Sequence, residues 1–175
     1  FIMLGMQSHF CYRVVKALLQ QGQQPSALIL AGQSNSTRRF ADIQLEINTQ
    51  TDHDLPTLCS QYQLACHYQS DIAVEHFLTT EHADFLLVAC WPQKISPAII
   101  GSVKHAALNL HPSLLPGYPG RDPVADQIRV QETRLGVSLH LIVDKFDAGD
   151  IVLQQAFEMD PPLSRQAIEE KAAPL

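Results

Sequence analysis

The sequence predicts an α/β protein with a Rossmann-like, open and mostly parallel sheet, helices on both faces and an antiparallel strand at the C-terminal end. Short apolar runs of strand length alternate with segments of helical periodicity along most of the chain. Several of these runs are continuously apolar, as expected for strands that are buried on both faces. The last two, 135–143 and 150–159, flank the turn segment DKFDAG, which predicts an antiparallel return.

The N-terminal half begins with an expected strand over 1–5 (FIMLG), and a second follows at 26–32 (SALILAG). Between them, Phe10, Val14 and Leu18 recur at helical spacing before Gly22, which indicates an amphipathic helix. Residues 33–53 are polar and predict a long loop. Two short helices are expected after it, over 54–64 and 71–80.

The C-terminal half carries most of the expected sheet. Its strands are predicted over 84–90 (DFLLVAC), 106–111 (AALNLH), 135–143 (LGVSLHLIV) and 150–159 (DIVLQQAFEM). Helices are predicted over 95–103 (ISPAIIGSV) and over 164–175 (SRQAIEEKAAPL). Ligands of such sheets bind beyond the carboxyl ends of the strands, so polar residues at those ends are the candidate site.

Composition sets the class of protein. The chain has 175 residues and is 46% hydrophobic, which suits one domain over 1–175, with truncation at either end left open. A net charge of -6 without a basic run argues against extended nucleic-acid contact. Four cysteines without CxxC spacing, and no apolar run of about 20 residues, predict a cytoplasmic protein with reduced thiols and no membrane association. The oligomeric state stays open.

The segment NLHPSLLPGYPG follows an apolar strand and raises the question of a site. Asn109 and His111 are two residues apart, so both side chains project from one face at the end of the strand. Pro112 ends the strand and holds His111 in an extended conformation. Either residue alone would be read as a turn cap or a polar strand end. Together, at a ligand-binding edge, they favour a functional site.

A second polar cluster, DKFDAGD, follows the strand at 135–143. Asp144 and Asp147 with Gly149 are typical of an ordinary acidic turn. If the strands at 106–111 and 135–143 are neighbours, however, we expect both carboxyl ends to open onto one crevice. Asp147 would then face Asn109 and His111.

Such a trio suits acyl transfer to an amine. The Asn109 amide and a protonated His111 can donate hydrogen bonds to the carbonyl oxygen as negative charge develops on it. Asp147 can move the proton of the attacking amine, directly or through a water. We also expect Asp147 to keep His111 protonated at neutral pH, because a nearby carboxylate favours the imidazolium.

At these residues the sequence resembles the folate-dependent formyltransferases, through NLHPSLLP, SLHLIVDKFDAGDIV and the spacing from His111 to Asp147. The resemblance covers residues 84–155. It implies 10-formyltetrahydrofolate as co-substrate and Asn109, His111 and Asp147 as the catalytic trio. We expect no metal site, because the eight histidines are scattered along the chain. The resemblance also implies folate contacts from the loops after two strands, at Trp91, Gln93, Ile95, Val143, Asp144 and Phe146. For Trp91, packing is an equally good interpretation, and Ser138 and His140 border this region on their strand.

The formyl acceptor does not follow from the resemblance. The segment GMQSHF lacks the phosphate loop of the glycinamide ribonucleotide enzymes. In the segment GYPGRDP, which follows Leu-Leu-Pro, Arg121 is the lone basic residue. We expect a small amine or an amino-sugar nucleotide as acceptor. The catalytic core of a methionyl-tRNA formyltransferase is the closest alternative, with tRNA the less favoured partner. A formyltetrahydrofolate hydrolase and a non-catalytic folate-binding module stay open.

Overall fold

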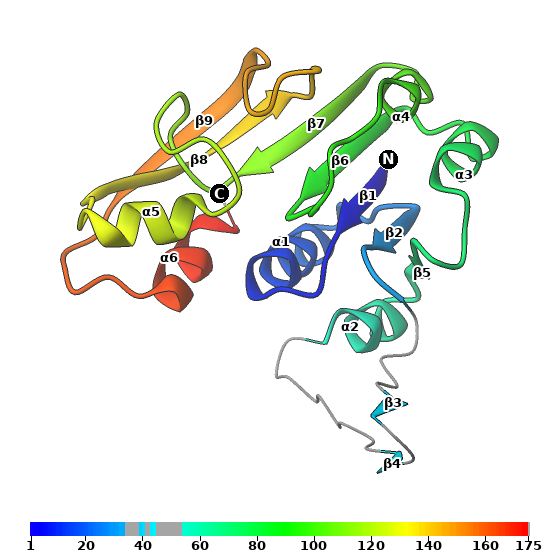
Figure 1. The fold of residues 1–175 in the computed structure, drawn as a ribbon, viewed down its shortest axis with the longest axis horizontal. Helices are drawn as coiled ribbons and strands as arrows, with labels where there is room; N and C mark the ends of the chain where they lie inside the picture. Colours follow the sequence, from blue (N-terminus) through cyan, green and yellow to red (C-terminus); the bar gives the residue numbers. More distant parts are fainter. Residues whose placement is uncertain (34–38, 41–42, 45–53, 175) are drawn as a thin grey trace.

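The computed structural model describes residues 1–33, 39–40, 43–44 and 54–174. Figure 1 shows a seven-stranded sheet in the order β5-β2-β1-β6-β7-β8-β9. Its strands are β1 (Ile2–Gly5), β2 (Ala27–Leu30), β5 (Ala65–Tyr68), β6 (Phe85–Ala89), β7 (Ala106–His111), β8 (Arg134–Leu141) and β9 (Ile151–Glu158). The first five in chain order are parallel to one another, which confirms the predicted fold class.

Most helices start at a polar cap that the sequence provides. Ser8 caps α1 (His9–Gln20) by accepting a hydrogen bond from the Cys11 amide, and Asp54 caps α2 (Leu55–Gln61) in the same way through Thr57. The remaining helices are α3 (Val74–Thr80), α4 (Pro97–Gly101), α5 (Pro123–Arg129) and α6 (Arg165–Ala172). Outside residues 33–53, two elements were not expected from sequence. They are β5, which is only partly buried, and α5, a seven-residue helix that follows a proline-rich turn.

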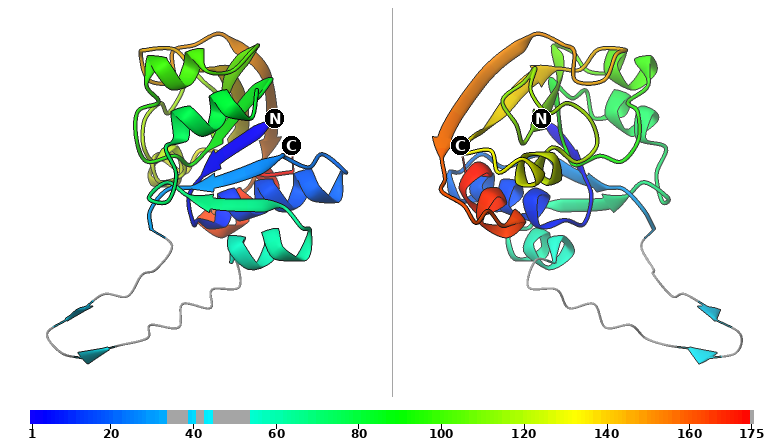
Figure 2. Two further views of the ribbon diagram at one scale, coloured as in Figure 1. Left: turned by 90° about the vertical axis from the view of Figure 1, so that its right-hand side faces the viewer. Right: turned by 60° about the vertical axis from the view of Figure 1, so that its left-hand side comes forward.

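Helices lie on both faces of the sheet, as the views in Figure 2 show, and each face has its own apolar layer. On one face, α1, α2 and the end of α6 pack against the sheet through residues such as Phe10, Val15 and Leu58. On the other face, α3 and α4 pack through Val74, Leu78 and their neighbours. The strand β1, in the interior of the sheet, is fully buried, as its uninterrupted apolar sequence predicts. In the described parts of the chain, no helix is long and apolar enough to cross a membrane.

The C-terminal end of the sheet is antiparallel, as predicted, and the reversed strand is β8. It pairs antiparallel with β7, so Leu108 lies beside Leu141 and His111 beside Ser138. The carboxyl end of β8 therefore lies beside the first half of β7. The expectation that both strands open onto one crevice through their carboxyl ends is wrong. The loop after β8 brings Asp147 back to His111 instead.

The expected long loop over 33–53 lies mostly outside the described residues. Within it the structure describes two short strands, β3 (Arg39–Phe40) and β4 (Ile43–Gln44), which pair antiparallel as a separate two-stranded sheet.

Candidate active site

The candidate site forms where β7 and β8 pair. Asn109 and His111 alternate with Leu110, which packs on the α1 face, so the two polar side chains lie on the opposite face. The antiparallel register places His140 directly across from Asn109 and Ser138 directly across from His111. A buried polar patch therefore interrupts an otherwise apolar sheet face.

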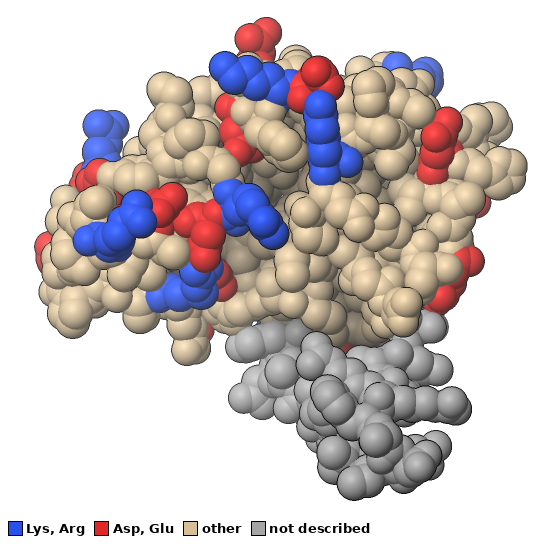
Figure 3. Space-filling model, viewed as in Figure 1, with Lys and Arg blue, Asp and Glu red and all other residues tan. Residues whose placement is uncertain are grey.

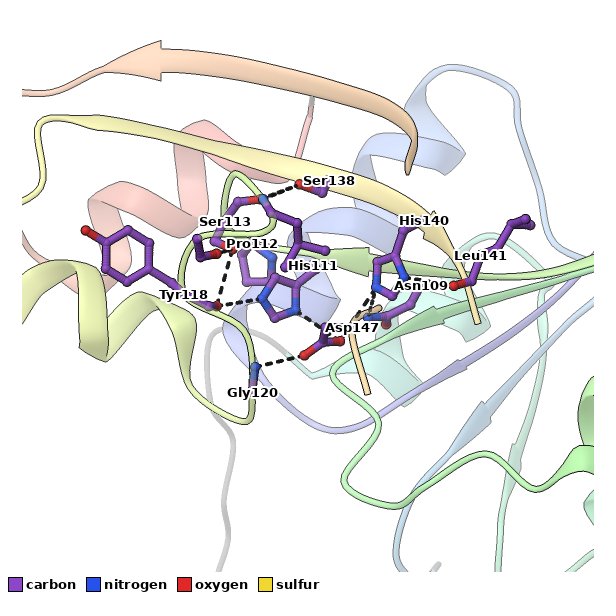
Figure 4. A network of polar contacts seen from close by, with 12 residues as sticks. Asn109, His111, Pro112, Ser113, Tyr118, Gly120, Ser138, His140, Leu141 and Asp147 are labelled. Carbon is purple, nitrogen blue, oxygen red and sulfur yellow. Dashed lines mark hydrogen bonds and ion pairs between the residues drawn. The ribbon is translucent and has the colours of Figure 1, made fainter. Parts of the chain in front are cut away.

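His111 is 4% exposed and both of its ring nitrogens have a partner (Figure 4). Its Nε2 lies 3.0 Å from the carbonyl oxygen of Tyr118, and its Nδ1 lies 3.7 Å from Oδ1 of Asp147. A carbonyl oxygen only accepts hydrogen bonds, so Nε2 carries the proton. In the neutral ring, Nδ1 then holds a lone pair that faces Asp147.

Burial lowers the pKa of His111 below its ordinary value of 6.5. The Tyr118 carbonyl and the Asp147 carboxylate both act to raise it, while His140 acts to lower it, and burial outweighs the carboxylate. The expectation that Asp147 keeps this imidazole protonated at neutral pH is therefore wrong. His111 rests in the neutral form and can accept a proton at Nδ1.

Asp147 lies in the loop that leaves β8, with a side chain that is 10% exposed. Its φ of 49° belongs to the left-handed region, which is costly for most residues and is often found at functional sites. The Gly120 amide donates to Oδ2 at 2.8 Å. Burial opposes ionisation, but polar contacts that include the hydrogen bond from the Gly120 amide lower the pKa of this carboxyl group. Asp147 is therefore a carboxylate at neutral pH.

The Asn109 side chain is hydrogen-bonded to His140. From sequence, His140 was expected only to border the site. Asn109 Nδ2 lies 3.0 Å from His140 Nε2, and His140 Nδ1 lies 2.9 Å from the carbonyl oxygen of Leu141. His140 Nε2 is also 3.6 Å from Oδ1 of Asp147. The sequence signal for this contact is a pair of polar residues at matching positions on adjacent strands. It can be recognised only when the pairing of the two strands is known.

The backbone packing around residue 149 requires a glycine at this position. A Cβ at this position would lie 1.8 Å from the Leu141 carbonyl oxygen, the same atom that accepts a hydrogen bond from His140. Only a residue without a side chain allows this close approach.

A second set of contacts fixes the proline-rich loop after β7. The Ser138 hydroxyl donates to the Ser113 carbonyl at 2.6 Å and accepts from the Leu115 amide at 3.0 Å. The Gln154 side chain on β9 donates to the Leu115 carbonyl at 2.7 Å. Ser138 is fully buried by these contacts and has a structural role. The loop thereby presents the Tyr118 carbonyl and the Gly120 amide to the site, neither of which a side-chain motif reveals.

The expected folate residues lie on two loops that meet. Lys94, in the loop after β6, forms an ion pair with Asp144, in the loop after β8. Val143 and Phe146 are 42% and 67% exposed, so both offer apolar surface on the second loop. The two loops thus flank one apolar edge beside Asp147.

The residues expected in the first loop divide into two kinds. Trp91 is partly buried and packs on the α3–α4 core, and Gln93 accepts a hydrogen bond from the Gln69 side chain at 2.9 Å. Ile95 is 6% exposed and belongs to that core. A ligand contact from Ile95 is therefore expected from its backbone, not from its side chain.

Other hollows and clusters do not compete with this site. A groove of about 190 Å³ lies on the opposite sheet face, where apolar residues such as Val14, Leu110 and Leu153 line it. Its lining has no charged side chain for chemistry. Across the described residues, no group of three histidine, cysteine or acidic side chains is placed to hold a metal ion.

The fold and the site define a class: an open α/β sheet with an amide, an imidazole and a carboxylate gathered at one end, which suits acyl-group transfer. The family model for formyl transferase matches residues 2–175, so the chain belongs to the formyl transferase family.

Similarity to individual proteins agrees with this membership. The chain is 28% identical over 154 residues to the methionyl-tRNA formyltransferase of Lactobacillus acidophilus, a match that covers 87% of this chain and 47% of that protein. The chain spans no more than about half the length of the curated relatives it matches.

Solved structures show the same fold. The phosphoribosylglycinamide formyltransferase of Anaplasma phagocytophilum superposes with a TM-score of 0.69 at 17% identity, over 98% of this chain and 78% of that one. A sugar N-formyltransferase from a Shewanella species superposes with a TM-score of 0.62 at 16% identity, over 98% of this chain and 63% of that one.

Proposed function

We propose that this chain transfers a formyl group from 10-formyltetrahydrofolate to a primary amine, with Asn109, His111 and Asp147 as the catalytic residues. The observation that carries the proposal is the buried network at the β7–β8 junction. In this network His111 lies 3.7 Å and His140 lies 3.6 Å from Asp147 Oδ1, and His140 in turn lies 3.0 Å from the Asn109 amide.

The reaction forms one bond and breaks another. The amine nitrogen attacks the formyl carbon, and negative charge develops on the formyl oxygen before the bond from carbon to the folate nitrogen breaks. Asn109 Nδ2 is hydrogen-bonded to His140 through one of its two hydrogens, which leaves the other for this oxygen. Such a donor contributes about 3 kcal/mol to transition-state stability.

Proton movement falls to His111 and Asp147. The attacking amine must lose a proton, and neutral His111 accepts it at Nδ1, the nitrogen that faces Asp147 at 3.7 Å. The imidazolium formed is then stabilised by the ionised carboxylate. The same proton can pass to the folate nitrogen as it leaves, so the products are an N-formyl amine and tetrahydrofolate.

The folate is proposed to lie against the edge that the two loops form. Val143 and Phe146 offer apolar contact area for its ring, and Trp91, Gln93, Ile95 and Asp144 complete the proposed contacts. The Lys94–Asp144 ion pair would hold both loops beside the ligand.

The acceptor is proposed to be a small amine or an amino-sugar nucleotide. On the face shown in Figure 3, the basic side chains of the described residues stand next to acidic ones and form no continuous basic area. An extended tRNA contact would favour such an area. Methionyl-tRNA is the second candidate, because the curated relative that covers 87% of this chain is named for that acceptor.

A panel of acceptors tests the proposal. The protein is incubated with 10-formyltetrahydrofolate and, in separate reactions, with amino-sugar nucleotides, small primary amines and methionyl-tRNA, and the N-formyl product is measured by mass spectrometry. We expect one class to give a product whose formation requires the protein. Formation of formate alone would support the hydrolase alternative, and absence of any folate chemistry would support a binding module.

A further inference from the structure

His140 is 2% exposed and lies directly across from Asn109 on the neighbouring strand. Its two nitrogens have different partners. Nδ1 lies 2.9 Å from the Leu141 carbonyl oxygen, and Nε2 lies 3.0 Å from Asn109 Nδ2. Because the carbonyl can only accept, Nδ1 carries a proton, and in the neutral ring Nε2 then holds a lone pair.

An asparagine amide can be turned by 180° with little change in shape, so its orientation depends on its partners. A lone pair at His140 Nε2 accepts a hydrogen bond from the NH2 group, whereas it would repel the lone pairs of the amide oxygen. Among the described residues, no other acceptor is bonded to Asn109 Nδ2. Its second hydrogen is therefore available to a ligand.

We propose that His140 is a positioning residue: as the neutral Nδ1–H tautomer, it holds the Asn109 amide with its NH2 group turned toward the reacting carbonyl oxygen. The Leu141 carbonyl fixes the tautomer, and Gly149 leaves the space in which this carbonyl can meet the ring. The catalytic consequence rests on the proposed function, whereas the tautomer and the amide orientation do not.

The opposite arrangement defines what would contradict the proposal. Asp147 is the charged side chain that faces His140, with Oδ1 at 3.6 Å from Nε2, and the His111 ring lies edge-on with centroids 6.3 Å apart. If His140 were protonated at Nε2, that nitrogen would donate to Asp147. Asn109 would then turn its oxygen toward the ring and lose its role as donor to the substrate.

Two substitutions of His140 distinguish the loss of the hydrogen-bond acceptor at Nε2 from the loss of side-chain volume. In His140→Gln, the side-chain oxygen can occupy the place of Nε2 and accept from Asn109. In His140→Asn, the shorter amide can occupy the place of Nδ1 and bond to Leu141, but the acceptor for Asn109 is lost. We expect His140→Asn to lower kcat by roughly 10- to 100-fold with little change in KM for the folate, and His140→Gln to retain most of the activity.

A double-mutant cycle tests whether His140 acts through Asn109. In an Asn109→Ala background, His140→Asn should change kcat by less than about twofold, because the group that it positions is already gone. His105→Asn, at an exposed histidine near the start of β7, is the matched control and should leave activity unchanged. Equal losses in both His140 variants, or full additivity with Asn109→Ala, would overturn the proposal.

Nitrogen-15 NMR at pH 7 gives a readout that needs no turnover. Long-range proton–nitrogen correlations should show His140 with a protonated Nδ1 and an unprotonated Nε2, and the Asn109 NH2 protons should shift in His140→Asn. An imidazolium or an Nε2–H tautomer for His140 would refute the positioning role whatever the enzyme acts on. The expected tautomer together with no formyl transfer would support the amide orientation and refute the proposed function alone.

Discussion

The ends of β7 and β8 each place a buried histidine beside the same carboxylate oxygen, yet the two rings are held in opposite ways. His111 donates through Nε2 to the Tyr118 carbonyl and turns Nδ1 to Asp147. His140 donates through Nδ1 to the Leu141 carbonyl and turns Nε2 to Asp147 and Asn109. A backbone carbonyl thus decides which nitrogen of each ring faces the site.

The difference suits the two residues to the different tasks that we propose for them. The inward nitrogen of His111 meets only the carboxylate among the described residues, so it can take a proton in the reaction. The inward nitrogen of His140 is already engaged by Asn109 and orients that amide. Equal residue type and similar burial therefore do not imply equal function.

The largest effect is expected from Asp147→Asn, which keeps the shape of the loop but removes the charge that stabilises protonated His111. Turnover should fall by about 100- to 10,000-fold, as measured by formation of the N-formyl product. Asp150→Asn, an exposed acid in the same loop, is the control and should keep its activity. Near-normal turnover in Asp147→Asn would remove the carboxylate from the mechanism.

Asn109→Ala removes the proposed donor to the developing negative charge. We expect kcat to fall by roughly 100- to 1,000-fold, with the folate dissociation constant unchanged by calorimetry with a stable analogue. A variant that loses folate affinity and keeps kcat would instead place Asn109 in ground-state binding.

The pH dependence separates the two histidines more finely. Because the pKa of His111 is lowered below 6.5, kcat/KM should be constant near neutral pH and decline only as the pH falls through that lowered value. Asp147→Asn removes a group that raises this pKa, so the NMR titration of His111 should move to lower pH. A midpoint above 6.5 in the wild type would contradict the resting neutral form.

The lowered pKa values of His111 and Asp147 both make the folded protein less stable as the pH falls. Neutral buried His111 and ionised Asp147 both bind fewer protons in the folded state than in the unfolded state. Their contributions to the free energy of unfolding are present at neutral pH and are lost as the pH falls through the lowered folded-state pKa values.

The smallest effect is expected from the exposed ion pair that joins the two proposed folate-binding loops. Lys94→Ala breaks the exposed ion pair with Asp144, and pairs of this kind contribute only about 0.2 to 1 kcal/mol. KM for the folate should rise no more than about fivefold while kcat stays the same. Lys104→Ala, which breaks the exposed pair with Asp84 before β6, is the matched control and should leave KM unchanged.

The sequence was sufficient to predict most strands of the sheet and to propose Asn109, His111 and Asp147 as site residues, because apolar periodicity and the two polar motifs can be recognised from short stretches of the chain. It was insufficient where the geometry depends on strand direction. His140 reaches Asn109 only because β8 runs antiparallel to β7, and Asp147 reaches His111 only through the returning loop.

Electrostatics could not be predicted from residue type either. A carboxylate next to a histidine indicates a raised pKa, yet burial of His111 outweighs that effect. The Tyr118 carbonyl and the Gly120 amide are backbone groups, whose positions follow from the loop conformation. The cytoplasmic location, the single-domain organisation and the acceptor remain predictions.

The most direct test of the account compares release of the formyl group with and without an amine. The protein is mixed with 10-formyltetrahydrofolate, and tetrahydrofolate, formate and N-formyl product are followed together. Transfer predicts slow release without an acceptor and, once the right amine is added, faster release with one N-formyl product for each tetrahydrofolate, because the bound amine excludes water and is positioned for attack. Rapid release of formate that is independent of any amine would contradict it.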